Sequence, residues 1–228
     1  MVKQVETERP SEVPAAKKLK HTHRKPSQTA QQADFRPELP VQFLKSEEPT
    51  SKLTLVFELD EVLALASVFP VTHTTSEVQY TSPEGFFKFF VAFRPGLMDF
   101  FAFVKQHFEL VLFTSATQEY AEACLQKLDP TLFERRFYRS DCEAKGKTFV
   151  KNLKVLNRPL SQVILLETFS TRPSTAEDNI LRVKPWNGDP DDRTLLYLMY
   201  FFSKLEEVND VRPAVAQFRQ IALQTALL

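Results

Sequence analysis

Three short apolar runs constrain the fold of this chain more than any other feature of its sequence. They cover Leu53–Glu58, Glu109–Thr114 and Val163–Leu166, and each is a nearly continuous stretch of β-prone residues. Such a run is typical of a strand buried on both faces, which is the usual condition of a strand in a parallel sheet. Because both faces of that sheet need a cover, the segments between the runs are expected to form helices.

The remaining segments supply those helices and two further strands. Ser115 together with Gln118 matches the pattern of a capping box, and Asp191 is placed to cap a later helix. Shorter strands are expected near Arg136–Tyr138 and Ile180–Val183. The alternation predicts an α/β fold with a parallel sheet flanked by helices. Apolar residues recur at helical spacing in four segments: Leu97–Phe108, Tyr120–Leu128, Leu195–Leu205 and Pro213–Thr225.

A small β-hairpin insertion is expected between Val68 and Phe93, with its turn at Pro83-Glu-Gly85. Its second strand places aromatic residues on both faces, which usually indicates a core strand. An excess of aromatic residues on a hairpin edge is instead typical of a partner-binding surface. Both interpretations stay open, and the second assigns partner binding to Phe86, Phe87, Phe89 and Phe90.

Polar residues follow each of the three buried strands. Because parallel strands bring their carboxyl ends to one edge of the sheet, these side chains are expected to meet in one crevice. Carboxylates and a hydroxyl gathered there predict a magnesium and phosphoryl site. The residues concerned are Glu58 and Asp60, Thr114 and Ser115, and Glu167 and Thr168.

Composition excludes several other kinds of site. The chain has four glycines, too far apart to form a phosphate-binding loop of an ATPase or of a dinucleotide-binding domain. Two cysteines cannot form a disulfide framework or a thiolate-rich zinc site. The longest apolar run, Leu195–Phe202, is far shorter than the ~20 residues of a membrane helix, so no membrane span is expected.

The first fifty residues differ in composition from the rest. Residues 1–33 hold seven basic and three acidic residues and no aromatic one, whereas the whole chain balances 29 basic against 29 acidic residues. We therefore expect an extended basic, proline-rich tail over 1–50 and one domain over 51–228. The basic run is compatible with an RNA-contacting arm, a nuclear import signal or a solvated patch. It comprises Lys17, Lys18, Lys20, Arg24 and Lys25.

Six segments in order resemble the haloacid-dehalogenase superfamily, in the branch of the RNA polymerase II carboxy-terminal-domain phosphatases, over about residues 52–215. The last segments are similar to the phosphatase-like receptor subunit of the mitochondrial inner-membrane presequence translocase. The resemblance implies a Rossmann-like parallel sheet. The segments are Leu55–Leu63, Arg94–Gly96 with Phe108–Ser115, Gly146–Leu153, Val163–Thr168, Lys184–Asp192 and Asp210–Pro213.

The resemblance also implies a role for each residue at the strand ends. In active members an aspartate attacks phosphorus and a second one acts as acid and base, and these positions hold Glu58 and Asp60. Thr114 and Lys151 match the phosphate-binding residues, and Glu167 stands with Glu58 and Asp60 at the magnesium position. The usual Asp, Thr, Asp and Asn are replaced in this sequence by Glu58, Val62, Glu167 and Thr168.

These replacements argue against catalysis. Glutamate is longer than aspartate by a methylene, and a misplacement of ~1 Å can cost about 10²-fold in rate. Glu58 and Glu167 are then vestigial ligands, kept charged by solvent or paired with Lys151. Lys151 has a second interpretation, as part of a solvated basic face with Lys145, Lys147 and Lys154.

We therefore expect a pseudophosphatase that acts as a scaffold or binding subunit of a mitochondrial assembly, either translocase-like or a ribonucleoprotein such as a ribosome. Its partners are proteins, with RNA added if the tail binds it, and it needs no cofactor. The alternative is a weak Mg²⁺-dependent serine/threonine phosphatase. A nuclear location is the alternative to a mitochondrial one.

Overall fold

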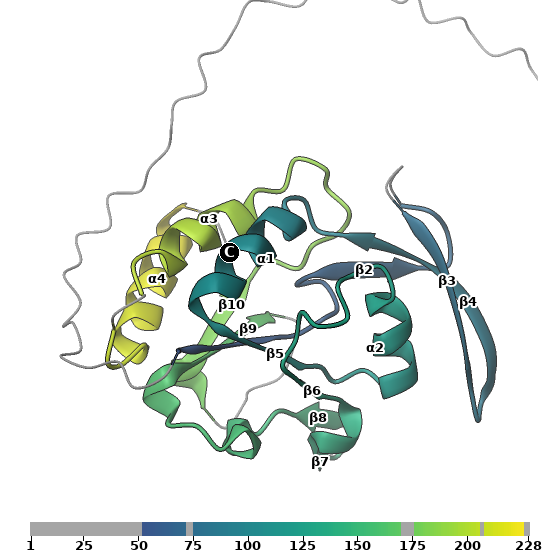
Figure 1. The fold of residues 1–228 in the computed structure, drawn as a ribbon, viewed down its shortest axis with the longest axis horizontal. Helices are drawn as coiled ribbons and strands as arrows, with labels where there is room; N and C mark the ends of the chain where they lie inside the picture. Colours follow the sequence, from purple (N-terminus) through teal and green to yellow (C-terminus); the bar gives the residue numbers. More distant parts are fainter. Residues whose placement is uncertain (1–51, 72–74, 170–175, 206–207, 226–228) are drawn as a thin grey trace, which may run out of the picture. The chain divides into compact units, whose positions relative to one another are not determined.

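The computed structural model describes residues 52–71, 75–169, 176–205 and 208–225 (Figure 1). The predicted tail, its boundary at residue 50 and its five basic residues from Lys17 to Lys25 lie outside the described residues. Within the described part, the predicted α/β fold is confirmed, with a parallel sheet flanked by helices and an additional antiparallel hairpin.

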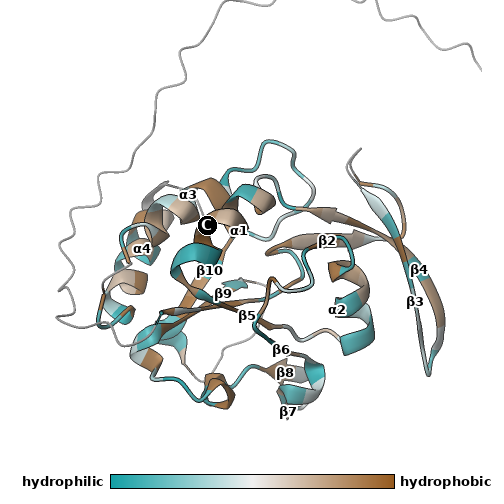
Figure 2. Ribbon diagram, viewed as in Figure 1, coloured by the Kyte–Doolittle hydropathy of each residue, from teal (hydrophilic) through white to brown (hydrophobic). Residues whose placement is uncertain are grey.

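The central sheet has five strands in the order β10-β9-β1-β5-β6, and all its pairs are parallel. β1 (Thr54–Phe57) lies in the middle, between β9 (Val163–Thr168) and β5 (Glu109–Phe113). β10 (Ile180–Val183) and β6 (Arg135–Phe137) form the edges. Every residue of β1, β5 and β9 is buried, as expected of the continuous apolar runs, and Figure 2 shows β5 mostly in brown.

Aromatic packing covers one face of this sheet. The Phe57 ring of β1 lies 6.0 Å from that of Phe100 and 5.8 Å from that of Phe101, and Phe100 in turn contacts Phe202. The opposite face, which includes Val56, is closed in part by the short 3₁₀ helix Leu153–Leu156. None of the described helices is both long and apolar enough to cross a membrane. The α-helices are α1 (Leu97–His107), α2 (Gln118–Leu125), α3 (Thr194–Phe202) and α4 (Arg212–Thr225).

A second, antiparallel sheet holds the predicted hairpin. Its order is β2 (Ala64–Ser67), β4 (Gly85–Phe93) and β3 (Ser76–Ser82). The turn falls at Pro83 and Glu84, because Ser82 pairs with Gly85, whose φ of 135° is readily adopted only by glycine. A smaller hairpin joins β7 (Glu143–Lys145) to β8 (Thr148–Val150) and leads directly into Lys151.

Both predicted helix caps are wrong. The cap of α2 is Thr117, whose side chain accepts a hydrogen bond from the Tyr120 N–H, while Ser115 lies before the helix and contacts Glu58. α3 begins at Thr194, and its first N–H donates to the side chain of Asp192 instead of Asp191. In each case a side chain nearer the helix start reaches the free N–H groups of the first turn.

Candidate functional site

A buried ion-pair cluster lies at the carboxyl ends of β1 and β9. The Lys151 ammonium is 2.5 Å from Glu58 Oε2 and 2.5 Å from Glu167 Oε1. Glu58, Lys151 and Glu167 are only 2%, 4% and 1% exposed. Burial alone would lower the pKa of Lys151, but the two carboxylates outweigh it and raise that pKa. The cluster therefore holds one ammonium between two carboxylates, so Glu58 and Glu167 are both paired with Lys151.

Both oxygens of Glu58 already accept hydrogen bonds. Oε1 accepts from the Leu59 N–H at 2.8 Å, and Oε2 accepts from Lys151 and from the Ser115 N–H at 3.3 Å. Thr114 is fully buried, and its hydroxyl accepts from the Ala116 N–H at 3.1 Å. The nucleophile position and the threonine are thus both engaged in contacts within the chain. The interpretation of Lys151 as part of a solvated basic face is wrong, because Lys151 is buried. The other three lysines of that face are exposed: Lys145, Lys147 and Lys154.

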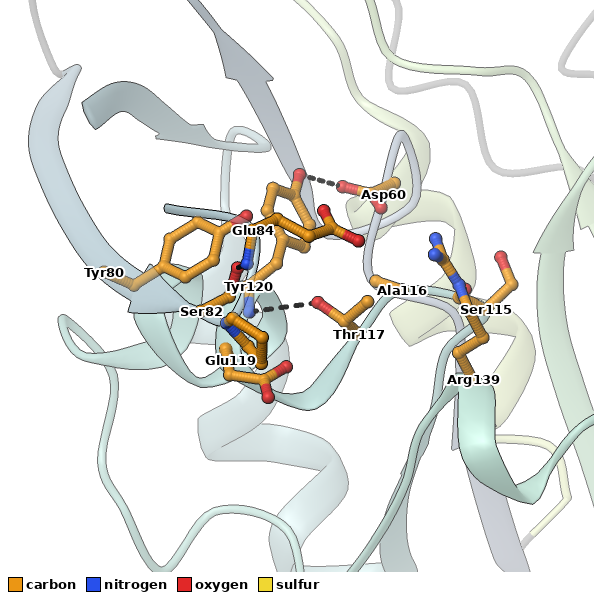
Figure 3. Close-up of a pocket in the computed structure, with 11 residues that line it drawn as sticks. Asp60, Tyr80, Ser82, Glu84, Ser115, Ala116, Thr117, Glu119, Tyr120 and Arg139 are labelled. Carbon is orange, nitrogen blue, oxygen red and sulfur yellow. Dashed lines mark hydrogen bonds between the residues drawn. The ribbon is translucent and has the colours of Figure 1, made fainter. Parts of the chain in front are cut away.

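Asp60, unlike the members of this cluster, lines an open pocket. The pocket has a volume of about 500 Å³ and lies between the β3–β4 turn and the start of α2 (Figure 3). The Tyr120 hydroxyl donates to Asp60 Oδ1 at 2.6 Å. Of the five residues with proposed catalytic, phosphate or metal roles, only Asp60 lines the pocket. Its other lining residues include Tyr80, Glu84, Ser115, Tyr120 and Arg139.

Burial gives Asp60 the character of a proton donor. Desolvation raises its pKa from 3.8 to about 6, against the opposing effect of the Tyr120 hydrogen bond, and the charge of Glu58 adds to the rise. Burial, and after it the charge of Asp60 and this hydrogen bond, raise the pKa of Tyr120. The sequence identified Asp60 but not Tyr120. The contact between them depends on how α2 packs against the loop after β1, and no sequence motif indicates that packing.

Replacing Asp60 with asparagine is expected to stabilise the fold above about pH 6 and to leave it unchanged below about pH 4. Its folded-state pKa of about 6 exceeds 3.8, so the folded state binds the proton more tightly. The native chain therefore loses stability as pH rises through this window. Asparagine, which keeps the acceptor for Tyr120, should avoid about 1–2 kcal/mol of that loss, less than the full shift because the pocket admits water.

Urea unfolding across pH measures this effect, with Asp191→Asn as a matched change at an exposed aspartate. Asp191→Asn should follow the native pH profile. Equal profiles for the native chain and Asp60→Asn would contradict the assignment of a raised pKa to Asp60.

A magnesium ion does not fit the strand ends as they stand. Mg²⁺–oxygen bonds measure roughly 2.0–2.1 Å, so an ion on either Glu58 Oε2 or Glu167 Oε1 would lie within about 4.6 Å of the Lys151 ammonium. Two unit charges 4 Å apart repel by about 4 kcal/mol near a protein surface, and the double charge of Mg²⁺ doubles that repulsion. Among the described residues no group of three or more His, Cys, Asp or Glu side chains is arranged to hold a metal ion.

Arg94 holds the loop that carries Asp60, a role that the sequence did not reveal. It is 1% exposed, and its guanidinium binds both carboxylate oxygens of Asp192 at 2.9 Å. It also donates to the carbonyls of Glu61 and Val62, each at 3.3 Å, and to that of Lys184 at 3.0 Å. The available signal was that Arg94 and Asp192 each lie in a segment of the resemblance.

The four hairpin phenylalanines divide into two pairs. Phe86 and Phe87 are 64% and 36% exposed. Phe89 is buried, and its ring stacks on Tyr120 with centroids 5.3 Å apart, while Phe90 is half-buried. Phe87 stacks on Tyr80, a wall of the pocket, at 5.1 Å. The outer pair is thus available to a partner, and Phe89 belongs to the packing between the hairpin and α2.

Carboxylates at the carboxyl ends of the first and fourth strands of a parallel sheet, a threonine after another strand and a nearby lysine are the arrangement that the resemblance to haloacid-dehalogenase-type phosphatases implies. The chain belongs to the family of NLI interacting factor-like phosphatases, whose family model matches residues 53–212. The chain is similar in structure to the solved structure of Fcp1, an RNA polymerase II CTD phosphatase, with a TM-score of 0.50. The match covers 76% of this chain and 54% of the Fcp1 chain. At 20% identity, that likeness shows the fold alone.

Relatives in this family carry different names. CTD small phosphatase-like protein 2 of Dictyostelium discoideum is 32% identical over 179 residues, which cover 77% of this chain and 31% of that protein. Mitochondrial import inner membrane translocase subunit tim50 of Emericella nidulans is 38% identical over 131 residues, or 56% of this chain and 25% of that protein. The chain thus spans about a quarter to a third of the length of these two relatives.

Proposed function

We propose that this chain is a pseudophosphatase, a phosphatase-type domain that binds a protein partner as a non-catalytic subunit of a mitochondrial assembly. One observation carries the loss of catalysis. The Lys151 ammonium joins Glu58 to Glu167 at 2.5 Å on each side, in a cluster that is closed to solvent. A nucleophile must reach phosphorus, and Glu58 neither lines the pocket nor has an oxygen without a hydrogen bond.

The outer hairpin supplies the partner-binding surface in this proposal. Phe86 and Phe87 expose large apolar rings at the tip of β4, where burial in an interface would be favourable. The Tyr80 ring contacts both Phe87 and Phe89 and so joins this surface to the buried part of the hairpin. The likeness to a mitochondrial import translocase subunit supports both a protein partner and a mitochondrial location. RNA contact or nuclear import through Lys17–Lys25 stays a prediction, because that run lies outside the described residues.

A second candidate, a weak Mg²⁺-dependent serine/threonine phosphatase, has one observation in its favour. Asp60 lines the pocket with a pKa of about 6, which suits a general acid. In this alternative Glu58 would leave Lys151 when substrate and Mg²⁺ enter, and Asp60 would protonate the leaving oxygen. The relative named as a CTD small phosphatase-like protein supports an ancestry in which such chemistry was present.

Turnover of an aryl phosphate with and without Mg²⁺ separates the two functions. We expect no metal-dependent release of phosphate above that of a protein-free blank, because Glu58 is bound on both oxygens. Magnesium-dependent turnover that disappears in Asp60→Asn would overturn the pseudophosphatase proposal. The Asp60 variant serves as the control because it removes the acid while keeping the acceptor for Tyr120.

Partner binding is measured separately, by purifying the native assembly from mitochondria and comparing how much partner protein is recovered with each variant. Phe86→Ser should release the partner, whereas Phe149→Ser, at a phenylalanine on β8 that is 40% exposed, should retain it. Equal recovery of partner with both variants would contradict the hairpin surface.

A further inference from the structure

The positive charge between the carboxylates at the strand ends is a side chain of the protein, the ammonium group of Lys151. We infer that the Lys151 ammonium serves in place of a divalent metal ion, so that the folded chain neither needs nor binds Mg²⁺ at Glu58 and Glu167. The inference deepens the proposed function and rests on it, because both concern the same carboxylates. It adds a statement about metal binding that loss of catalysis alone does not require.

The two carboxylates each direct one oxygen at the same ammonium. Nζ lies 2.5 Å from Glu58 Oε2 and 2.5 Å from Glu167 Oε1, although the two glutamates come from different strands. In the longer glutamate side chains, the extra methylene carries each carboxylate further from its strand than an aspartate would. The geometry is therefore that of a bridged cation site in which nitrogen takes the central position.

The backbone on either side of Lys151 fixes this cation in place. Val150 and Leu153 are 5% and 1% exposed, and Leu153 packs in the core against the central sheet. The backbone that carries Lys151 is therefore anchored, since moving it would expose these apolar residues to water. A tethered group also competes with a free ion at a high effective concentration, so dissolved Mg²⁺ is at a disadvantage.

Removal of the ammonium should allow a divalent metal ion to bind at Glu58 and Glu167. A neutral side chain at position 151 would leave two buried carboxylates facing one space, and oxygen ligands of this kind are those that Mg²⁺ and Mn²⁺ prefer. Ser115 contacts Glu58 and also lines the pocket, so the pocket lies next to the carboxylate that would receive the ion. The variant is thus expected to acquire a metal site that the native chain lacks.

The test compares thermal unfolding of the native chain and of Lys151→Met in MgCl₂, with NaCl at matched ionic strength as the reference. The native midpoint should not change. That of Lys151→Met should rise by roughly 5–10 °C at a metal concentration about 100 times the dissociation constant. Electron paramagnetic resonance of Mn²⁺ should show bound metal in the variant alone, and the further changes Glu58→Gln and Glu167→Gln should abolish it.

Two results would overturn the inference. One is Mg²⁺ or Mn²⁺ bound to the native chain and lost in Glu58→Gln/Glu167→Gln. The other is a folded Lys151→Met that gains no metal response. If Lys151→Met does not fold without metal, Lys151→Gln and refolding in MnCl₂ take its place, and failure of both to bind metal counts against the inference. Metal binding by the native chain without turnover overturns this inference alone, whereas Mg²⁺-dependent turnover overturns the proposed function as well.

Discussion

Replacing Lys151 with methionine is expected to lower the free energy of unfolding by about 3–5 kcal/mol in metal-free buffer at neutral pH. Methionine matches the length of the lysine stem but carries no charge. Glu58 and Glu167, which are 2% and 1% exposed, would then lose the cation that compensates their burial. Removing one member of a buried ion-pair cluster leaves a buried charge uncompensated, which costs more than the intact pair contributes. Urea unfolding followed by circular dichroism measures the loss.

Two further variants show whether the loss comes from the charge cluster. Lys154→Met makes the same chemical change at an exposed lysine and should alter stability by no more than about 0.5 kcal/mol. Combining Lys151→Met with Glu58→Gln and Glu167→Gln should recover much of the loss, because neutral amides cost less to bury. A loss for Lys151→Met no larger than that for Lys154→Met would show that the cluster does not carry the assigned energy.

The central sheet was predictable because burial on both faces determines the composition of each strand by itself. A strand covered on both faces has to be apolar at nearly every position. The sequences of β1, β5 and β9 show this pattern directly. β2 was missed because its four residues, of which only Ala64 is buried, form a strand only by pairing with β4. The caps were wrong for a related reason. Both choices depended on which of several neighbouring polar side chains reaches the helix start.

The candidate site was predictable only to the extent that parallel strands align their ends. Glu58 and Glu167 meet at one ammonium and Ser115 contacts Glu58, as this alignment predicts, and Lys151 followed from the resemblance. The contact between Tyr120 and Asp60 could not be predicted, since it depends on how α2 packs against the hairpin. Whether Lys151 meets solvent or carboxylates was likewise decided by packing of the segment after β8.

Replacing Arg94 with lysine is expected to lower the free energy of unfolding by about 2–4 kcal/mol, although the charge is retained. The planar guanidinium binds Asp192 through two nitrogens while reaching the carbonyls of Glu61, Val62 and Lys184. An ammonium has three donors on one atom and cannot reach acceptors this widely spaced. Some of these buried acceptors would therefore be left without a partner, at about 1–3 kcal/mol for each.

The loop carrying Asp60 should loosen at the same time, which distinguishes this clamp from an ordinary ion pair. Glu61 has a φ of 60°, a strained value for a residue with a side chain, and its carbonyl is held by Arg94 and by the Trp186 N–H. Amide hydrogen exchange over 61–64 should therefore be faster in Arg94→Lys. Arg182→Lys, at the more exposed pair with Glu177, is the matched control and should cost less than about 1 kcal/mol. If both variants lose equal stability and residues 61–64 exchange at the native rate, the conformation of the Asp60 loop does not depend on Arg94.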